Sequence, residues 1–234
     1  MRISGSIALV TGANRGIGRH FAGQLVERGA AKVYATARRP EQIDIPGVER
    51  LRLDITDPRS VEEAAAVASD VTLLVNNAGI STYTNLVNGD LGKIRSELDT
   101  HFWGTLSMVR AFAPVLGANG GGAILNVLSA LSWFSYDGAN AYAVAKAAEW
   151  SLTNGIRLEL AGQGTLVTGL HLGAADTDMM AGYDVDKMDP ADVVRAALDG
   201  VEAGRFEVLA DESSTYVKAS LANDPSDFYT STAR

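Results

Sequence analysis

Three residues near the middle of the chain have side chains suited to moving a proton. Lys146 follows Tyr142 by four residues, and Ser129 lies thirteen residues before Tyr142. If a helix begins near Tyr142, positions four apart share one face, one turn from each other. An ammonium beside a phenol favours the phenolate, so Lys146 should lower the pKa of Tyr142 from its ordinary value of about 10. Because this pair also occurs on ordinary helices, the elements around it must decide its role.

A glycine-rich turn lies near the N-terminus. Residues 7–10 form a short apolar run typical of a buried parallel strand, and residues 11–18 read TGANRGIG. An amphipathic segment then continues to Arg28 and ends at Gly29. The free N–H groups at the start of such a helix favour a pyrophosphate. The spacing G-x-x-x-G-x-G differs from the common dinucleotide fingerprint, so a turn without a ligand is the alternative.

The end of the second expected strand bears on cofactor choice. This strand covers residues 32–36 and is followed by Ala37 and Arg38. Where many dinucleotide folds offer an acidic residue to the ribose 2′-hydroxyl, this chain has Ala37. Arg38, with Arg15 of the glycine turn, has the charge to receive a 2′-phosphate, which favours NADP(H) over NAD(H). The alternative is that both arginines are solvated surface charges.

Strands alternate with helices along the rest of the chain. Further strands are expected at 48–53, 71–75, 165–171 and 206–209, and another one follows the glycine-rich turn at 120–122 and runs through Val127. Helices are expected from Asp57-Pro58, over 90–116 and 142–160, and from Asp189-Pro190 to about 203, with a frayed tail from Phe228. This alternation predicts an α/β fold, a doubly wound parallel sheet of about seven strands with helices on both faces (a Rossmann fold), in one domain over residues 1–234.

Two adjacent amides, Asn76 and Asn77, come directly after the fourth strand and precede Ala78 and Gly79. They would hold the backbone of a neighbouring strand or line a nucleotide cleft. A simple turn rich in asparagine is the competing interpretation.

Composition excludes several classes of function. There is no cysteine and there are three scattered histidines, which argues against disulfides, a cysteine nucleophile and a zinc site. With 20 Lys and Arg against 28 Asp and Glu, the net charge of −8 argues against nucleic acid or an anionic membrane as a partner. The N-terminal apolar run is too short for a membrane span and lacks a signal-peptide pattern, so a cytoplasmic location is expected.

These motifs together resemble the short-chain dehydrogenase/reductase family, over about residues 4–209. The resemblance rests on TGANRGIG at 11–18, NNAG at 76–79, and Ser129 with Tyr142-x-x-x-Lys146. It implies that Tyr142 is the general acid in carbonyl reduction, that Ser129 orients the substrate oxygen, and that Lys146 lowers the pKa of Tyr142 and holds the nicotinamide ribose. The cofactor-binding residues that it implies, besides Tyr142, Lys146 and Arg38, are Gly12, Asn14, Arg15, Gly16, Ile17, Gly18, Asp54, Ile55, Asn77, Ala78, Gly79, Gly173 and Thr177.

Two departures from the family pattern stand out. Relatives usually carry an asparagine on the long helix, thought to hold a water that connects the lysine to solvent, and the matching residue here is His101. An imidazole can donate or accept a hydrogen bond, so His101 is either a relay member in the catalytic group or a packed structural residue. Relatives also tend to have Pro-Gly after the sixth strand, where this chain has Leu172-Gly173, which affects the loop to Thr177.

The resemblance implies an NADPH-dependent carbonyl reductase with an apolar ketone or aldehyde as substrate, working as a homodimer or homotetramer. Candidate apolar lining residues are Trp133, Phe134, Met179, Met180 and Tyr183, although core or dimer contacts would also explain them. The segment between Thr177 and Asp189 is short, which favours an open pocket and a broad substrate range. The alternatives are an NAD-dependent alcohol dehydrogenase and a non-catalytic regulator that binds NADP(H).

Overall fold

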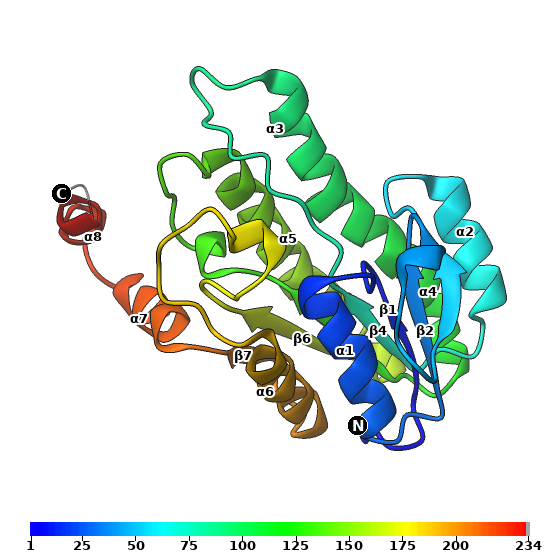
Figure 1. Cartoon of the computed structure of the whole chain (residues 1–234). Coiled ribbons are helices and arrows are strands. Elements are labelled where there is room, and N and C mark those ends of the chain that lie inside the picture. The colour runs from blue at the N-terminus through cyan, green and yellow to red at the C-terminus, as the bar shows by residue number, and fades with distance from the viewer. Residues whose placement is uncertain (233–234) are drawn as a thin grey trace.

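The computed structural model describes residues 1–232 and contains one parallel sheet of seven strands (Figure 1). The strand order is β3-β2-β1-β4-β5-β6-β7, so the direction of winding reverses between β1 and β4. The strands are β1 (Ile7–Val10), β2 (Lys32–Ala37), β3 (Glu49–Arg52), β4 (Leu73–Asn76), β5 (Ala123–Val127), β6 (Leu166–His171) and β7 (Glu207–Leu209). The predicted fold class is confirmed, and each strand lies within one or two residues of its predicted bounds. In such a sheet, ligands bind at the carboxyl edge near the reversal.

Helices cover both faces of this sheet (Figure 1). The helices are α1 (Gly16–Glu27), α2 (Pro58–Val67), α3 (Leu91–Leu98), α4 (Thr105–Ala118), α5 (Asn140–Glu159), α6 (Pro190–Glu202), α7 (Glu212–Ser220) and α8 (Pro225–Thr232). Helices α1 and α6 pack together on one face, whereas α2 and α4 pack on the other face with α5. Among the described residues, no helix is long and apolar enough to cross a membrane.

The central strands are apolar on both sides because both faces of the sheet are buried there, whereas the edge strand β3 is mostly exposed. In β1, Ala8 and Val10 belong to one hydrophobic cluster with Phe21 of α1. Leu9, between them, belongs to the other cluster with Phe112 of α4. Successive strand side chains point to opposite faces, so a parallel strand covered twice reads as a continuous apolar run. This is why the strands could be located from sequence.

Aspartates fix the start of four helices. The side chains of Asp57, Asp90, Asp189 and Asp211 each accept a hydrogen bond from a backbone N–H in the first turn of α2, α3, α6 and α7. Such a cap satisfies N–H groups that otherwise have no partner in the helix. Helix α1 differs, because Arg15 at its N-cap makes no side-chain cap and no acidic residue lies in its first turn. The N-terminus of α1 therefore keeps N–H groups for another acceptor.

The single helix predicted over 90–116 is wrong. The structure has α3, then a π-helical turn over Asp99–Gly104, and then α4. A π-helical turn adds a residue to the turn and changes the direction of the side chains that follow, and such turns are frequent at functional sites. Apolar periodicity does not distinguish one wide turn within a long helix. The consequence is that His101, inside this turn, is buried.

The C-terminal tail is also different from the prediction. Residues 212–232 contain α7 and α8, where a frayed tail was expected from Phe228. The ring of Phe228 lies 5.2 Å from that of Phe134, and the Tyr229 hydroxyl accepts a hydrogen bond from the Ser135 N–H at 3.1 Å. These long-range contacts hold a short helix whose local sequence gives little signal. Helix α8 therefore lies against the segment that follows Ser129.

Candidate active site

The glycine turn after β1 takes the shape that its sequence predicts. Gly12 and Gly16 have φ of +67° and +52°, in the left-handed region that favours glycine. A Cβ on Gly18 would lie 2.2 Å from the Gly12 carbonyl oxygen and 2.4 Å from Nδ2 of Asn77, so only glycine fits there. The turn therefore presents bare backbone in front of the uncapped N-terminus of α1, which suits a pyrophosphate.

The amides after β4 hold this turn in place. Nδ2 of Asn77 donates to the carbonyl oxygens of Thr11 at 2.9 Å and Gly12 at 3.3 Å. The Thr11 hydroxyl accepts from the backbone N–H groups of Asn77 and Ala78, both at 2.9 Å. Of the two alternatives left open by the sequence, the amide of Asn77 thus holds the backbone of the neighbouring segment. Its predicted contact with the cofactor ribose stays a prediction.

Asn76 has a purely internal role. Its Nδ2 donates to Oδ1 of Asn126 in β5 at 2.8 Å, and Nδ2 of Asn126 donates to the Thr153 hydroxyl of α5 at 2.9 Å. The Thr153 hydroxyl in turn donates to the carbonyl oxygen of Glu149 at 2.8 Å. This buried chain ties the middle of the sheet to the helix that carries Tyr142 and Lys146.

The loop after β6 lies against the glycine turn. A Cβ on Gly16 would lie 3.4 Å from Cγ2 of Thr177, and Arg15 forms an exposed ion pair with Asp178 at 3.4 Å. The start of this loop is held by Asp211, whose Oδ2 accepts from the Gly173 N–H at 2.6 Å. The structure thus brings Thr177 next to the turn that is expected to hold the pyrophosphate.

Leu172 has a clear role in place of the usual proline. Its carbonyl oxygen accepts from the Ala130 N–H at 2.8 Å, and its side chain is buried in the cluster under α6. The backbone hydrogen bond ties the end of β6 to the residue after Ser129. Leucine in place of proline therefore leaves the end of β6 joined to the segment that follows Ser129.

On the expected adenosine side, Arg38 and Arg39 are exposed cations without a side-chain hydrogen bond or ion pair to the described residues. Ala37, directly before them, is buried. The Asp54 carboxylate accepts from Thr56, and Ile55 is buried against Gly104. Side-chain Nδ2 of Asn14 donates to Gln42 at 3.2 Å. No carboxylate replaces Ala37 at this edge, so the residues fit a dinucleotide that carries a 2′-phosphate.

The Ser129 hydroxyl accepts one backbone hydrogen bond and keeps its own hydrogen for donation. Ser129 caps a 3₁₀ turn over Ala130–Ser132, and its Oγ accepts from the Leu131 N–H at 3.1 Å. The Ser132 hydroxyl is engaged with the Ser129 N–H at 3.3 Å, which distinguishes the two serines. A hydroxyl can accept and donate together, so Ser129 can still donate, and it hydrogen-bonds with Tyr142.

The ammonium of Lys146 is buried and has two strong acceptors. Its Nζ donates to the Val127 carbonyl oxygen and to Oε2 of Glu149, both at 2.7 Å. An ammonium has three donors, so one is left for the ribose contact that the resemblance implies. Burial lowers the pKa of Lys146, but the charges of Glu149 and Tyr142 and the hydrogen bond to Glu149 raise it, and the pKa is raised overall. Lys146 is therefore positively charged near neutral pH.

Tyr142 differs from the simple expectation of a lowered pKa. Burial raises the pKa of its phenol, and the carboxylates of Glu149 and Glu97 raise it further. Lys146, 5.7 Å from the ring centre, and the hydrogen bond with Ser129 both lower it, as predicted, but the pKa is raised overall. Tyr142 thus holds its proton near neutral pH, which is the state that a general acid needs.

Two carboxylates were missed by the sequence reasoning. Glu149 lies beside Lys146 and accepts from the Thr105 hydroxyl at 3.1 Å, and Glu97 accepts from the Thr82 N–H at 2.6 Å. His101 lies between them, with its ring edge-on to Tyr142 at 5.2 Å between centroids. A Cβ on Gly79 would lie 2.7 Å from Cε1 of His101, so this glycine makes room for the imidazole. The spacing of Glu149 three residues after Lys146, on one helix face, was a usable signal.

The apolar candidates for the substrate site divide into two groups. Trp133 stacks on buried His171 at 3.8 Å between centroids, and Phe134 packs on Phe228, so both have intramolecular partners. Tyr183 lies 5.8 Å from Tyr83, whose hydroxyl donates to the carbonyl oxygen of Met179. Tyr83 has a positive φ of 52°, which is uncommon for a residue other than glycine. The segments after β4 and β6 thus meet over the site.

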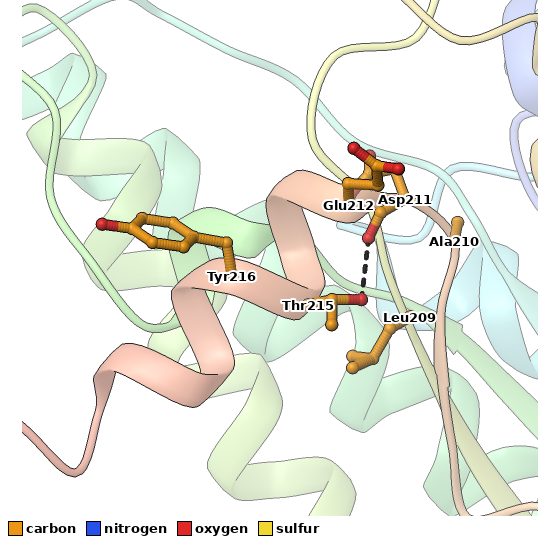
Figure 2. A pocket seen from close by; sticks show the side chains of 6 residues that line it. All are labelled: Leu209, Ala210, Asp211, Glu212, Thr215 and Tyr216. Carbon is orange, nitrogen blue, oxygen red and sulfur yellow. Dashed lines mark hydrogen bonds between the residues drawn. The ribbon is translucent and has the colours of Figure 1, made fainter.

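Figure 2 shows a separate open groove of about 450 Å³ at the end of β7. It is lined by Leu209, Ala210, Asp211, Glu212, Thr215 and Tyr216. The Thr215 hydroxyl donates to the carbonyl oxygen of Asp211 at 3.0 Å, as drawn, and this is a bond within α7. The groove contains none of the predicted site residues, and its two carboxylates do not suit a phosphate-bearing cofactor.

Comparison with known proteins agrees with this arrangement. A family model described as short chain dehydrogenase matches residues 6–187. The chain belongs to the short chain dehydrogenase family. An uncharacterized oxidoreductase of Staphylococcus aureus (strain MW2) is 29% identical over 209 residues, which cover 84% of this chain and 90% of the relative. This short chain dehydrogenase is therefore an oxidoreductase.

Solved structures share the fold over nearly the whole chain. A short chain dehydrogenase from Burkholderia cenocepacia J2315, in complex with NADP, is 37% identical with a TM-score of 0.94 and covers 98% of both chains. A short chain dehydrogenase/reductase from Burkholderia phymatum, in complex with NAD, has a TM-score of 0.84 at 21% identity and covers 99% of this chain and 96% of that one. The second likeness shows the fold alone. Of these two proteins with the same fold, one holds NADP and the other NAD.

Proposed function

We propose that this short chain dehydrogenase reduces a ketone or aldehyde to an alcohol with NADPH, and that Tyr142 is the general acid. The observation that carries the proposal is the meeting of Ser129, Tyr142 and Lys146 at the carboxyl edge of the sheet, where the glycine turn opens. The protonated phenol and the charged lysine are the states that reduction requires.

The residues divide the work in the following way. When bound, the nicotinamide supplies the hydride. The hydroxyl hydrogen of Ser129 would bind the substrate oxygen and hold it toward Tyr142, whose proton completes the alcohol. Lys146 would then stabilise the phenolate by its charge. Oxidation in the opposite direction would use the same phenolate as the base.

The preference for NADPH rests on the end of β2. Arg38 is exposed without a partner among the described residues, and buried Ala37 stands where an acidic residue would favour NAD. A guanidinium–phosphate contact is charge-assisted and favours the 2′-phosphate.

The segment after β6 that we call the lid, from Ala175 to Met188, suits an apolar substrate. This segment is closed at its base, because the Asp176 N–H donates to the Met188 carbonyl oxygen and the Met188 N–H donates to that of Ala174, both at 2.9 Å. The lid is therefore short, and its inner groups include Tyr183 and Met179 beside Tyr83. These support a broad range of apolar carbonyl compounds over phosphorylated ones.

The first variant that tests the proposal removes the general acid. Tyr142→Phe should lower kcat for ketone reduction by at least about 100-fold, because the acid is lost. The Kd for NADPH, measured by fluorescence, should stay within a few-fold of wild type. Retained turnover would show that another acid works. If the wild type binds NADPH tightly but turns over no ketone, the result would instead support the alternative of a non-catalytic regulator that binds NADP(H).

Arg38→Asp tests the cofactor preference. Loss of a charge-assisted hydrogen bond of about 2 kcal/mol, with added repulsion, should weaken NADPH binding by at least about 30-fold and change NADH binding little. Arg39→Asp, at the exposed neighbouring position, is the matched control. An unchanged ratio of NADPH to NADH affinity in Arg38→Asp, or the same change in Arg39→Asp, would refute the assignment.

A further inference from the structure

A cluster of four ionisable side chains lies behind Tyr142, and it is buried. The exposed fractions are 0% for Glu97, 1% for His101, 4% for Lys146 and 2% for Glu149. The side chains come from α3, the π-helical turn and α5. Oε2 of Glu149 lies 2.7 Å from Nζ of Lys146 and 3.8 Å from Nδ1 of His101, and Nε2 of His101 lies 3.4 Å from Oε2 of Glu97. The four groups thus form a continuous row.

The charges in this row do not balance if the imidazole is neutral. Two carboxylates would then face one ammonium, and an uncompensated buried carboxylate is costly. One additional proton, on His101 or on a carboxylate, removes the imbalance. The buried location therefore favours a row that holds one more proton than Lys146 alone carries.

The hydrogen-bond geometry leads to the same conclusion. Nε2 of His101 lies 2.8 Å from the Ile80 carbonyl oxygen and 3.4 Å from the Ile80 nitrogen, and we assign a hydrogen to Nε2 because the shorter of the two contacts is to an acceptor. In a neutral ring the other nitrogen, Nδ1, would then present a lone pair to Glu149. Nδ1 of His101 and Oε2 of Glu97 are both buried without a hydrogen-bond partner among the described residues. A hydrogen on Nδ1 would face the Glu149 carboxylate across 3.8 Å and would replace the repulsion between two acceptors by attraction.

We propose that Glu149 and His101, with Glu97 behind them, store a proton beside Lys146 and return it to Tyr142 in each catalytic cycle. This inference rests on the proposed reduction. In that reaction the Tyr142 O–H bond breaks as the new O–H bond of the alcohol forms. The phenolate regains its proton through Lys146, and Lys146 regains one from the Glu149–His101 pair. The row then takes up one proton from solvent, so each reduction consumes one proton.

The outer end of the row is close to the surface. Oε1 of Glu97 accepts from the N–H of half-buried Thr82, and the next residue, Tyr83, is exposed. At the inner end, Tyr142 faces the row from α5, and His171 faces Lys146, a member of the row, from β6. These are the other titratable groups whose charge acts on the site. Glu97, His101 and Glu149 are positioning residues, since they act on the substrate only through Lys146 and Tyr142.

The test uses Glu149→Gln, which keeps the shape and removes the charge and the proton site. Glu159→Gln, an exposed carboxylate on the same helix, is the control. In the full-length protein without cofactor, the ionisation of Tyr142 is followed by ultraviolet absorbance, as the difference from the same background carrying Tyr142→Phe. The midpoint of Tyr142 ionisation should move to lower pH in Glu149→Gln, because the variant lacks a carboxylate that opposes the phenolate. In Glu159→Gln this midpoint should not move.

Turnover supplies the second measurement. Glu149→Gln should lower kcat at least 10-fold, with a larger loss at alkaline pH where protons are scarce, while KM for the ketone and Kd for NADPH stay within about three-fold. His101→Leu, which installs a side chain that can neither carry a proton nor hold a water, should give a similar loss. A variant with both Glu149 and His101 substituted should have a kcat no lower than that of the slower single variant, because the two residues act as one unit.

Each outcome has a defined meaning. An unchanged kcat together with an unchanged Tyr142 midpoint in Glu149→Gln overturns the inference, as does a double variant whose losses multiply. A fall in thermal stability with unchanged kcat would show a structural role only and also overturns it. If Glu149→Gln does not fold, Glu149→Asp replaces it, and proton delivery should then be preserved in part. A wild type that reduces no ketone refutes the proposed function, whereas the Tyr142 midpoint still tests the coupling.

Discussion

Acid should destabilise this protein through His171, the buried histidine at the end of β6. Its Nδ1–H donates to the Ser129 carbonyl oxygen at 3.0 Å, and its ring stacks on Trp133. Nε2 has no hydrogen-bond partner among the described residues, and the nearest carboxylate oxygen, on Glu207, lies 3.7 Å away. Burial lowers the pKa of His171 to about 4, helped by the positive charges of Lys218 and Lys146 and opposed by the bond to Ser129.

The magnitude follows from proton linkage. The unfolded chain protonates this histidine near its ordinary pKa of 6.5, whereas the folded chain resists until about 4. The stabilisation is therefore complete above about pH 6.5 and is lost as the pH falls toward 4. Each pH unit in that window costs about 1.4 kcal/mol, so His171 should remove about 2 kcal/mol from the free energy of unfolding between pH 7 and pH 5.

Urea unfolding at pH 7 and at pH 5 measures this effect. His171→Asn should be less stable than wild type at pH 7, because it loses the stacking on Trp133, but its loss on moving to pH 5 should be smaller by about 2 kcal/mol. His20→Asn, on α1, is the control and should keep the wild-type loss. An acid-induced loss in His171→Asn as large as that of wild type would refute the reasoning.

Two other substitutions test how the cofactor turn is built. Gly18→Ala would place a methyl group 2.2 Å from the Gly12 carbonyl oxygen and 2.4 Å from Nδ2 of Asn77. The affinity for NADPH, measured by fluorescence titration, should therefore fall at least 10-fold. An affinity equal to that of wild type would show that the turn relaxes freely. Asp211→Ala should cost about 2 kcal/mol in urea unfolding and raise KM for NADPH, because Asp211 both caps α7 and holds the Gly173 N–H. Asp211→Asn, which keeps one acceptor oxygen, should lose less than half as much, and an equal loss in both would contradict the capping explanation.

Much of the fold could be predicted from the sequence because the relevant signals are local. A strand covered on both faces is mostly apolar, so β1 appears as a short uninterrupted apolar run. Pro58 and Pro190, each after an aspartate, mark helix starts, and both lie in the first turn of their helices. The glycine turn was located for the same reason, since positive φ at Gly12 requires a particular residue type.

What the sequence did not contain was the environment of each side chain. Asn77 was equally compatible with a cleft or a backbone contact, and only the packing of β4 beside β1 brings its amide to Thr11. Helix α8 was missed because its stability depends on the contact of Phe228 with Phe134, far away in the chain. Neither question could be answered from spacing alone.

The proton-transfer site shows the same division most clearly. The sequence determined that Tyr142 and Lys146 share a helix face, because a spacing of four residues does so in any helix. It did not determine the pKa of Tyr142, which is raised because the tertiary structure buries the phenol and brings Glu149 and Glu97 close. Glu149 lies on the same helix as Tyr142, whereas Glu97 reaches the site through the contact between α3 and α5. Electrostatic effects depend on distance in space and on burial, and only the folded chain decides both.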